Sequence, residues 1–248
     1  VEFPQKVILS ATALGTYDLC PRRYFYQYRS HMPSLDPDVV GTGSVRIPPA
    51  TLGTYIHKVL ELCRTAPAEK AKELALLEES YSDGEKNVLR KEGGPLIDAY
   101  LASPLYAAYG DFPQDAEVDF ELPLMTVGNA SVYFEGSIDK VVHLPDGTLE
   151  IIDYKSGHPP LDGMERKAYS RQLAIYSLAA EALYHMKVSQ ASLHFLRNLS
   201  TWKLTDRDRE AAELKALLTK LQTFGEEEDF AVKTDACTYC GYGYFCKK

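Results

Sequence analysis

The chain has 248 residues, of which 45% are hydrophobic, 25% charged and 11% aromatic, and its formal net charge is −8. This composition is typical of a globular protein with a sizeable core in one large domain or two small ones, and it excludes disordered, collagen-like and coiled-coil classes. The sequence has no apolar run of the roughly 20 residues that a membrane-spanning helix needs, and no secretory signal pattern. We expect a soluble, intracellular (cytoplasmic) protein with no membrane partner. The first residue, Val1, is consistent with a piece of a larger protein.

Ser10 precedes an apolar periodic stretch and predicts the cap of a helix over 11–29 that is interrupted near Pro21. Arg22 and Arg23 lie in this helix among several aromatic residues. Two interpretations remain open: a surface that contacts nucleic-acid phosphates and bases, or a solvated face with the aromatic rings turned inward. The acidic net charge argues against a passive nucleic-acid coat, but not against an enzyme that confines its basic residues to one groove.

A loop rich in proline and glycine follows over 33–50, and Thr51 predicts the cap of a second helix. Five residues recur there at the spacing of one buried helical face: Leu52, Ile56, Val59, Leu60 and Cys63. Residues 68–92 are charged and helix-prone, with a break near Asp83. We expect a peripheral helical insertion over 66–115.

The hydrophobic pattern then changes from a period of about 3.6 residues to a period of two. Three segments rich in Val, Ile, Phe and Tyr are predicted strands: 116–126, 131–144 and 148–155. Next come a predicted helix over 168–186, strands over 190–197 and 201–204, and a helix over 206–224. This order predicts a mixed α/β (α+β) core with helices against a sheet.

The turn Pro145-Asp146-Gly147 lies between two predicted strands and favours a three-residue hairpin loop with glycine in the left-handed position. With the turn centred on Asp146, Asp139 lies directly opposite Asp153, and opposed residues point to the same face. Lys155 shares that face because side chains alternate along a strand. Two carboxylates and one ammonium group are therefore expected to converge.

Two like charges about 5 Å apart on an apolar sheet are costly unless a third group neutralises them. Carboxylate oxygens suit Mg²⁺ or Mn²⁺, and a nearby ammonium group can orient a water or stabilise charge on a phosphate. The competing interpretation is a salt bridge between an aspartate and Lys155, with the second aspartate at a solvated strand end. The hairpin alone leaves both open.

Five cysteines occur, and three of them form the motif Cys237-x2-Cys240-x5-Cys246 near the end of the chain. In an intracellular chain such a motif indicates a metal rather than disulfide bonds. Thiolates suit both Zn²⁺ and an iron–sulfur cluster, so the spacing does not choose between them.

Four ordered motifs resemble those of the PD-(D/E)XK nuclease superfamily, and most of all those of the RecB-family exonucleases. They are Gly53-x3-His57-x3-Glu61, Gly136-Ser-Ile-Asp139, Asp153-Tyr154-Lys155 and Gln172-x3-Tyr176. Each motif alone is weak, whereas their order over 51–180 is specific. The resemblance implies a restriction-endonuclease-like core with a central mixed sheet flanked by helices.

The resemblance also implies roles for individual residues. His57, Asp139, Asp153 and the backbone carbonyl of Tyr154 would ligate Mg²⁺ or Mn²⁺. Lys155 would position or activate the attacking water, so that Lys155, Asp153 and Asp139 form the catalytic set.

Gln172 and Tyr176 stand one helical turn apart on one face. By resemblance that face lies beside the active site, where both residues would orient the lysine or the DNA backbone. The alternative is an amphipathic helix whose glutamine merely lies at the edge of the core.

One cysteine before the motifs and three after them resemble the iron–sulfur staple of AddB-type helicase-nuclease subunits and of CRISPR-adaptation nucleases. This implies a [4Fe–4S] cluster on Cys20, Cys237, Cys240 and Cys246, whereas Cys63 is expected to pack as a small apolar residue. We expect a single nuclease domain over 1–248. Its staple segments would be 1–32 and 225–248, and its catalytic core 116–224 with the helix 51–65.

The resemblance implies a metal-dependent deoxyribonuclease, an exonuclease on single-stranded DNA or DNA ends in repair or recombination, alone or with a helicase. Two rivals are a catalytically silent DNA-binding or scaffold module and a zinc-stabilised interaction domain. The intact Asp139, Asp153 and Lys155 argue against the silent module, and iron in the protein would argue against the zinc domain.

Overall fold

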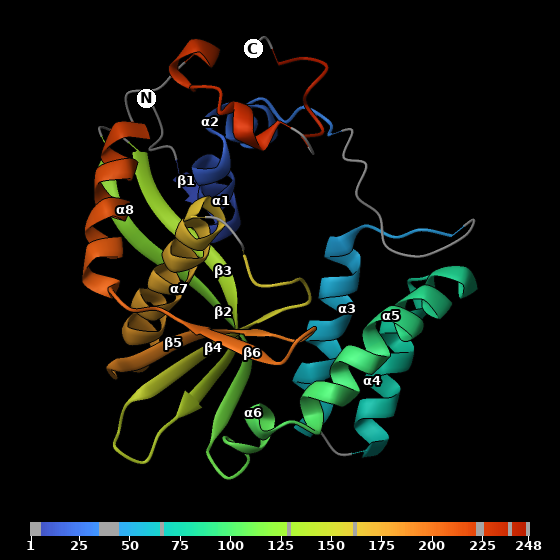
Figure 1. Cartoon of the computed structure of the whole chain (residues 1–248). Helices are drawn as coiled ribbons and strands as arrows, with labels where there is room; N and C mark the ends of the chain where they lie inside the picture. The colour runs from blue at the N-terminus through green and yellow to red at the C-terminus, as the bar shows by residue number, and fades with distance from the viewer. Residues whose placement is uncertain are drawn as a thin grey trace.

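A central mixed sheet of six strands has helices on both of its faces (Figure 1). The structure, a computed structural model, describes residues 6–34, 45–64, 67–127, 130–160, 163–221, 226–237 and 240–246. The strands are β1 (Lys6–Leu9), β2 (Gln114–Val127), β3 (Ala130–His143), β4 (Leu149–Lys155), β5 (Val188–Phe195) and β6 (Ser200–Lys203). The predicted mixed α/β architecture is confirmed.

Eight α-helices lie among the described residues. They are α1 (Ala11–Leu19), α2 (Pro21–Tyr24), α3 (Pro49–Glu61), α4 (Pro67–Glu79), α5 (Asp83–Leu101), α6 (Pro104–Ala107), α7 (Gly163–Tyr184) and α8 (Arg207–Leu221). A π-helical turn, Phe25–Arg29, continues α2. No helix in the described part of the chain is long and apolar enough to cross a membrane.

The long strand β3 organises the sheet. Strand β2 pairs antiparallel along one edge of β3. On the other edge, β1 pairs in parallel with the segment 131–134, and β4 pairs antiparallel with the segment 140–143. Strands β1 and β4 therefore pair with different parts of this edge and leave residues 135–139 of β3 between the two paired segments. Asp139 is the last of these residues.

The hairpin between β3 and β4 has the predicted register. Lys140 lies opposite Ile152 and His143 opposite Leu149. Gly147 has a φ of +81°, the left-handed conformation that the loop requires. This register places Asp139 and Asp153 on one face of the sheet, as the turn chemistry predicts.

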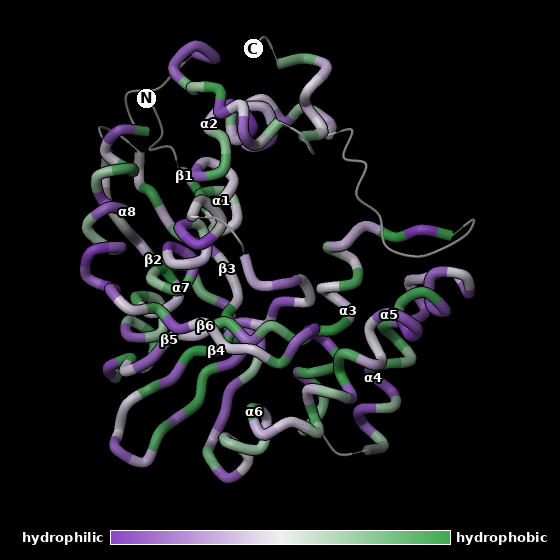
Figure 2. The backbone as a smooth tube through the Cα atoms, viewed as in Figure 1, coloured by the Kyte–Doolittle hydropathy of each residue, from purple (hydrophilic) through white to green (hydrophobic). Residues whose placement is uncertain are grey.

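The two faces of the sheet contribute to separate cores. One core joins the sheet to α1, α7 and α8, and the other joins it to α3 and α5. Figure 2 shows the apolar segments of the strands in the middle of the molecule and hydrophilic stretches recurring along α8. Residues 33 to 50 fall largely outside the described residues, so the loop predicted there is described only in part.

Two helix starts differ from the prediction, those of α3 and of α7, and α7 begins at Gly163 rather than at residue 168. Helix α3 begins at Pro49 instead of after Thr51, because a proline in the first turn has a fixed φ and no N–H to satisfy. The break in the charged segment lies just before Asp83, where Ser82 caps α5 in a capping box. Helix α1 begins as predicted, with the Ser10 side chain accepting the N–H of Ala13 at 3.0 Å.

Segments from the two ends of the chain lie side by side near the top of Figure 1. The N–H of Arg22 donates to the carbonyl of Ala231 at 3.2 Å, and the Tyr242 hydroxyl donates to the carbonyl of Met32 at 3.1 Å. The chain end therefore packs on the segment that follows α1.

Candidate active site

The two strands of the hairpin bring Asp139, Asp153 and Lys155 together. Lys155 Nζ lies 2.8 Å from Asp153 Oδ2. Asp139 Oδ2 accepts the backbone N–H of Tyr154 at 2.6 Å. An aspartate–lysine salt bridge is therefore present, but Asp139 is only 7% exposed and does not lie at a solvated strand end.

Helix α3 brings His57 to the same group of residues. His57 Nδ1 lies 3.3 Å from Asp139 Oδ1, and Nε2 lies 3.1 Å from the carbonyl oxygen of Tyr154. Burial lowers the pKa of His57, but its hydrogen bond to Asp139 and the charges of Asp139 and Asp153 outweigh burial and raise this pKa to about 9.

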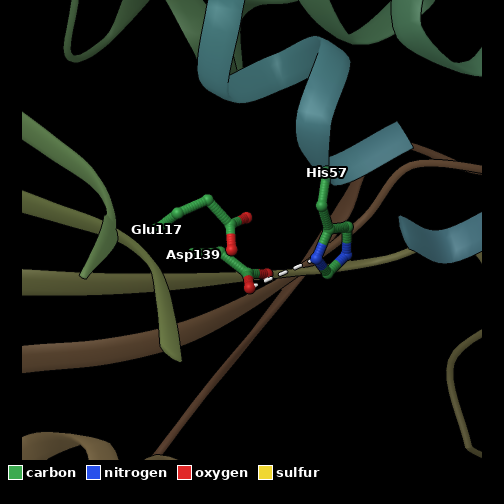
Figure 3. Close-up of side chains that lie close together, drawn as sticks. All are labelled: His57, Glu117 and Asp139. Atoms are coloured by element: carbon green, nitrogen blue, oxygen red, sulfur yellow. Dashed lines mark ion pairs between the residues drawn. The ribbon is translucent and has the colours of Figure 1, made fainter. Parts of the chain in front are cut away.

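A third carboxylate that the sequence analysis missed, Glu117 of β2, lies next to Asp139. The pairs Ala116 with Lys140 and Val118 with Ile138 enclose it, so it faces Asp139 across the two strands. Figure 3 shows the two carboxylates and the His57 ring directed toward one another. One ligand atom from each of these three residues lies within 4.8 Å of the other two.

Glu117 has a φ of +47°, although it is not a glycine and lies within a strand. Backbone strain of this kind persists where the surrounding structure enforces it, and it clusters at functional sites. Burial raises the pKa of Glu117, and the charge of Asp139 raises it further. The sequence contained no signal for this residue, because the register of β2 against β3 shifts between Pro123 and Met125, and a sequence pattern does not reveal such a bulge.

Gln172 and Tyr176, one turn apart on α7, complete the group. The Gln172 side-chain oxygen accepts from Lys155 Nζ at 2.9 Å. Its amide nitrogen donates to Asp153 Oδ1 and to the Tyr176 hydroxyl, both at 3.0 Å. The glutamine thus holds the lysine and an aspartate in one orientation rather than lying idle at the edge of the core.

The electrostatics of the site favour a cation. Burial raises the pKa of Asp153 to about 6, against the attraction of Lys155, and the charge of Asp139 raises it further. Burial lowers the pKa of Lys155, but the charge and hydrogen bond of Asp153 more than compensate and raise it. The group of His57, Glu117 and Asp139 offers two carboxylates and one imidazole, donors that suit a divalent cation.

The structure does not bring Arg22 to this site. Its Nη1 lies 2.5 Å from Glu227, its Nε donates to the Phe230 carbonyl at 2.8 Å, and its side chain is only 12% exposed. Tyr24 and Tyr26 beside it are buried. These contacts agree with the interpretation in which the aromatic rings turn inward, so we propose no DNA contact for Arg22.

Four of the five cysteines line one small cavity between the two ends of the chain. They are Cys20, Cys237, Cys240 and Cys246, and Arg23 lines the same cavity. Burial raises the pKa of the Cys246 thiol; Arg22 opposes this shift, and the other three thiols add to it. In the described residues, no three cysteine sulfur atoms lie within 4.8 Å of one another.

The fifth cysteine, Cys63, lies elsewhere. Its sulfur atom is 3.3 Å from the Tyr106 hydroxyl, so it packs with a polar contact rather than as a purely apolar residue.

A family model described as the PD-(D/E)XK nuclease superfamily matches residues 8–247. The chain belongs to this superfamily. PD-(D/E)XK nucleases use divalent metal ions, and His57, Glu117 and Asp139 form a group that could hold one in this chain. The restriction-endonuclease-like core implied by the resemblance agrees with the observed sheet and helices.

Two further comparisons are more distant. A protein from Streptococcus mutans that is named as a subunit of an ATP-dependent helicase/deoxyribonuclease is 27% identical over 176 residues, which are 64% of this PD-(D/E)XK nuclease and 15% of that protein. This chain therefore corresponds to a small part of that relative. The solved structure of SSO0001 covers 99% of this chain and 87% of its own at 15% identity and a TM-score of 0.45, a likeness too low to carry an argument.

Proposed function

We propose that this PD-(D/E)XK nuclease is a metal-dependent deoxyribonuclease that hydrolyses phosphodiester bonds as an exonuclease on single-stranded DNA or DNA ends. The observation that supports it most is the contact set of Lys155, which joins Asp153 and Gln172 beside Asp139 and His57. A silent module would have no need to keep a half-buried lysine in this arrangement.

His57, Asp139, Asp153 and the Tyr154 carbonyl would hold Mg²⁺ or Mn²⁺, with Glu117 as an additional carboxylate. The bound ion would act as a Lewis acid toward the phosphate and lower the pKa of a water molecule. Asp139 is held by the Tyr154 N–H, so its second oxygen faces His57. Because a ligating imidazole is neutral, binding of the ion would displace the proton that the raised pKa of His57 favours.

Lys155 would orient the attacking water and stabilise the charge that develops on the phosphate. Its raised pKa keeps it charged at neutral pH, as this role requires. Gln172 and Tyr176 would hold the lysine in place. Removing the ammonium group should therefore abolish cleavage without removing the metal ligands.

The direct test is cleavage of end-labelled DNA by purified variants with Mn²⁺, Mg²⁺ or EDTA. Asp153→Ala and Lys155→Ala should lose activity while their circular dichroism spectra and melting temperatures stay close to those of the natural protein. Asp208→Asn is the matched control, because Asp208 is exposed on α8, where it pairs with Arg207. Full activity in Asp153→Ala or Lys155→Ala would contradict the proposed site.

The cysteine cavity supports a second part of the proposal, a [4Fe–4S] cluster on Cys20, Cys237, Cys240 and Cys246. Tetrahedral zinc with bonds of about 2.3 Å would draw four sulfur atoms to about 3.8 Å from one another. The four cysteines share one cavity, although no three of their sulfur atoms in the described residues lie within 4.8 Å of one another. A cluster bound to all four would tie the two ends of the chain together.

The cluster is tested by anaerobic purification, a visible spectrum and analysis for iron and zinc. We expect a brown protein with iron and sulfide, and loss of colour in Cys237→Ser but not in Cys63→Ser. A colourless protein with one zinc ion would contradict the cluster and favour the zinc-stabilised domain.

The relative named as a helicase/deoxyribonuclease subunit supports a helicase partner, and the family resemblance implies a role in DNA repair or recombination. A pull-down with a helicase from the same genome, with and without DNA, tests this part.

A further inference from the structure

A buried ion pair joins the helix before the cysteine cavity to the helix that carries Gln172. Arg171 Nη1 on α7 lies 2.5 Å from Asp18 Oδ2 on α1, and the two side chains are 2% and 9% exposed. In the active-site contacts described above, neither Asp18 nor Arg171 touches a proposed metal ligand or Lys155. A buried charged pair is costly to desolvate and is a poor source of stability alone.

The pair lies where α1 and α7 approach each other closely. A Cβ atom on Gly15 of α1 would lie 3.4 Å from the Cβ of Ala168, which is one turn before Arg171 on α7. Helix α7 is thus held against α1 by close packing at Gly15 and by a buried ion pair at Asp18. The next residue, Gln172, makes hydrogen bonds of 2.9 and 3.0 Å to Lys155 and Asp153. If α7 rotated so that the Gln172 side chain moved by about 1 Å, both of these hydrogen bonds would break, since hydrogen bonds weaken steeply beyond about 3.2 Å.

Asp18 is also connected to the cysteine cavity. Its backbone carbonyl accepts a hydrogen bond from the ammonium group of Lys233. The carbonyl of Lys233 in turn lies 3.8 Å from the sulfur atom of Cys237, and Cys20 follows Asp18 by two residues. Lys233 therefore links the residue that anchors Arg171 to the segment that carries Cys237.

We propose that the Asp18–Arg171 pair is a positioning element. It holds Gln172 of α7 at hydrogen-bonding distance from Lys155, and it links this position of Gln172 to the cysteine cavity. The proposal rests on the proposed nuclease function. It predicts that the order of the cavity and the geometry of the active site depend on each other, because coupling between two sites is reciprocal.

A single substitution would leave an unpaired buried charge and could unfold the protein. The test therefore neutralises both partners in the double variant Asp18→Asn, Arg171→Met, which keeps side chains of similar size. The matched control is Lys167→Met, Glu213→Gln, which removes an exposed ion pair of 2.9 Å one turn earlier on α7. We expect the buried double variant to keep its melting temperature within a few degrees of the natural protein.

In DNA cleavage with saturating Mn²⁺, kcat of the buried double variant should fall at least tenfold, with less than a twofold change in KM for DNA. In a Gln172→Ala background the same double change should lower kcat less than twofold further, because neighbours that act through one another are not additive. The control pair should leave kcat unchanged. An unchanged kcat in the buried double variant, or a full tenfold loss in the Gln172→Ala background, would overturn the proposal.

Hydrogen exchange gives a readout that does not depend on activity. Amides of α7 around Gln172 should exchange faster in the buried double variant and in Cys237→Ser, and combining the two should add no further change. If the natural protein cleaves no DNA, the proposed function fails. The exchange data alone then test whether the Asp18–Arg171 pair positions α7. If the α7 amides of either variant exchange at the same rate as those of the natural protein, the proposed link is overturned.

Discussion

Glu117 shows how the environment of a single residue can assign it to the site when the sequence does not. It combines a left-handed φ of +47°, a cross-strand position opposite Asp139 and a pKa raised by burial. Asp139, Asp153 and Lys155 were predictable because one short turn fixes their register. The position of Glu117 depends on the pairing of β2 with β3, whose register shifts between Pro123 and Met125, and a sequence pattern does not specify such a shift.

Glu117→Gln keeps the shape of the side chain and removes its charge. We expect the affinity for Mn²⁺ to fall roughly 10- to 100-fold, the scale found for residues that support a metal site. Isothermal titration with Mn²⁺ measures this directly. Glu121→Gln, four residues further along β2, is the control, since Glu121 is exposed and pairs with Lys6. Equal affinities in the two variants would contradict a role for Glu117 in the metal site.

At the scale of elements, local signals were reliable and long-range pairings were not. The hairpin of β3 and β4 has the predicted register because its turn is specified by neighbouring residues. Strand β1 was missed, because four residues give too short a pattern and their partner in β3 lies more than 120 residues away. The start of α3 was placed two residues late, since Pro49 was assigned to the preceding loop.

Gly147→Ala tests the hairpin. A side chain at a φ of +81° costs roughly 1–2 kcal/mol, so we expect the free energy of unfolding to fall by about that amount. Gly53→Ala is the matched control in the interior of α3, where an added Cβ meets nothing within 4 Å. It should raise stability by roughly 0.5–1 kcal/mol. Denaturant unfolding measures both, and a gain in stability from Gly147→Ala would contradict the turn assignment.

At the scale of the whole molecule, stability depends on groups buried between the sheet and the helices on its α3 and α5 side. His194 is 1% exposed, and its Nδ1 lies 3.0 Å from the Tyr100 hydroxyl. Burial lowers the pKa of His194 to about 4, and the charges of Lys140 and Lys203 contribute. This histidine is therefore neutral in the folded protein at neutral pH. The sequence predicts a strand over 190–197 but does not indicate that the His194 side chain is buried.

Because the folded pKa of His194 lies below its ordinary value of 6.5, the unfolded chain takes up the proton first as the pH falls. The contribution to stability is complete above pH 6.5 and is lost as the pH falls to about 4, a loss of about 3 kcal/mol. His194→Gln keeps a hydrogen-bonding side chain and cannot titrate. Urea unfolding at pH 7 and pH 4 should show a smaller loss for the variant, by about that amount. Parallel losses in both proteins would contradict the burial of a neutral histidine.

The central claim is that this chain hydrolyses DNA with a divalent ion and Lys155. Its most direct test is incubation of end-labelled single-stranded DNA with the natural protein and with Lys155→Ala, each with Mn²⁺ and with EDTA. The natural protein should shorten the DNA only with Mn²⁺, and Lys155→Ala should leave it intact while still binding Mn²⁺. Intact DNA with the natural protein and Mn²⁺, or equal cleavage by both proteins, would contradict the claim.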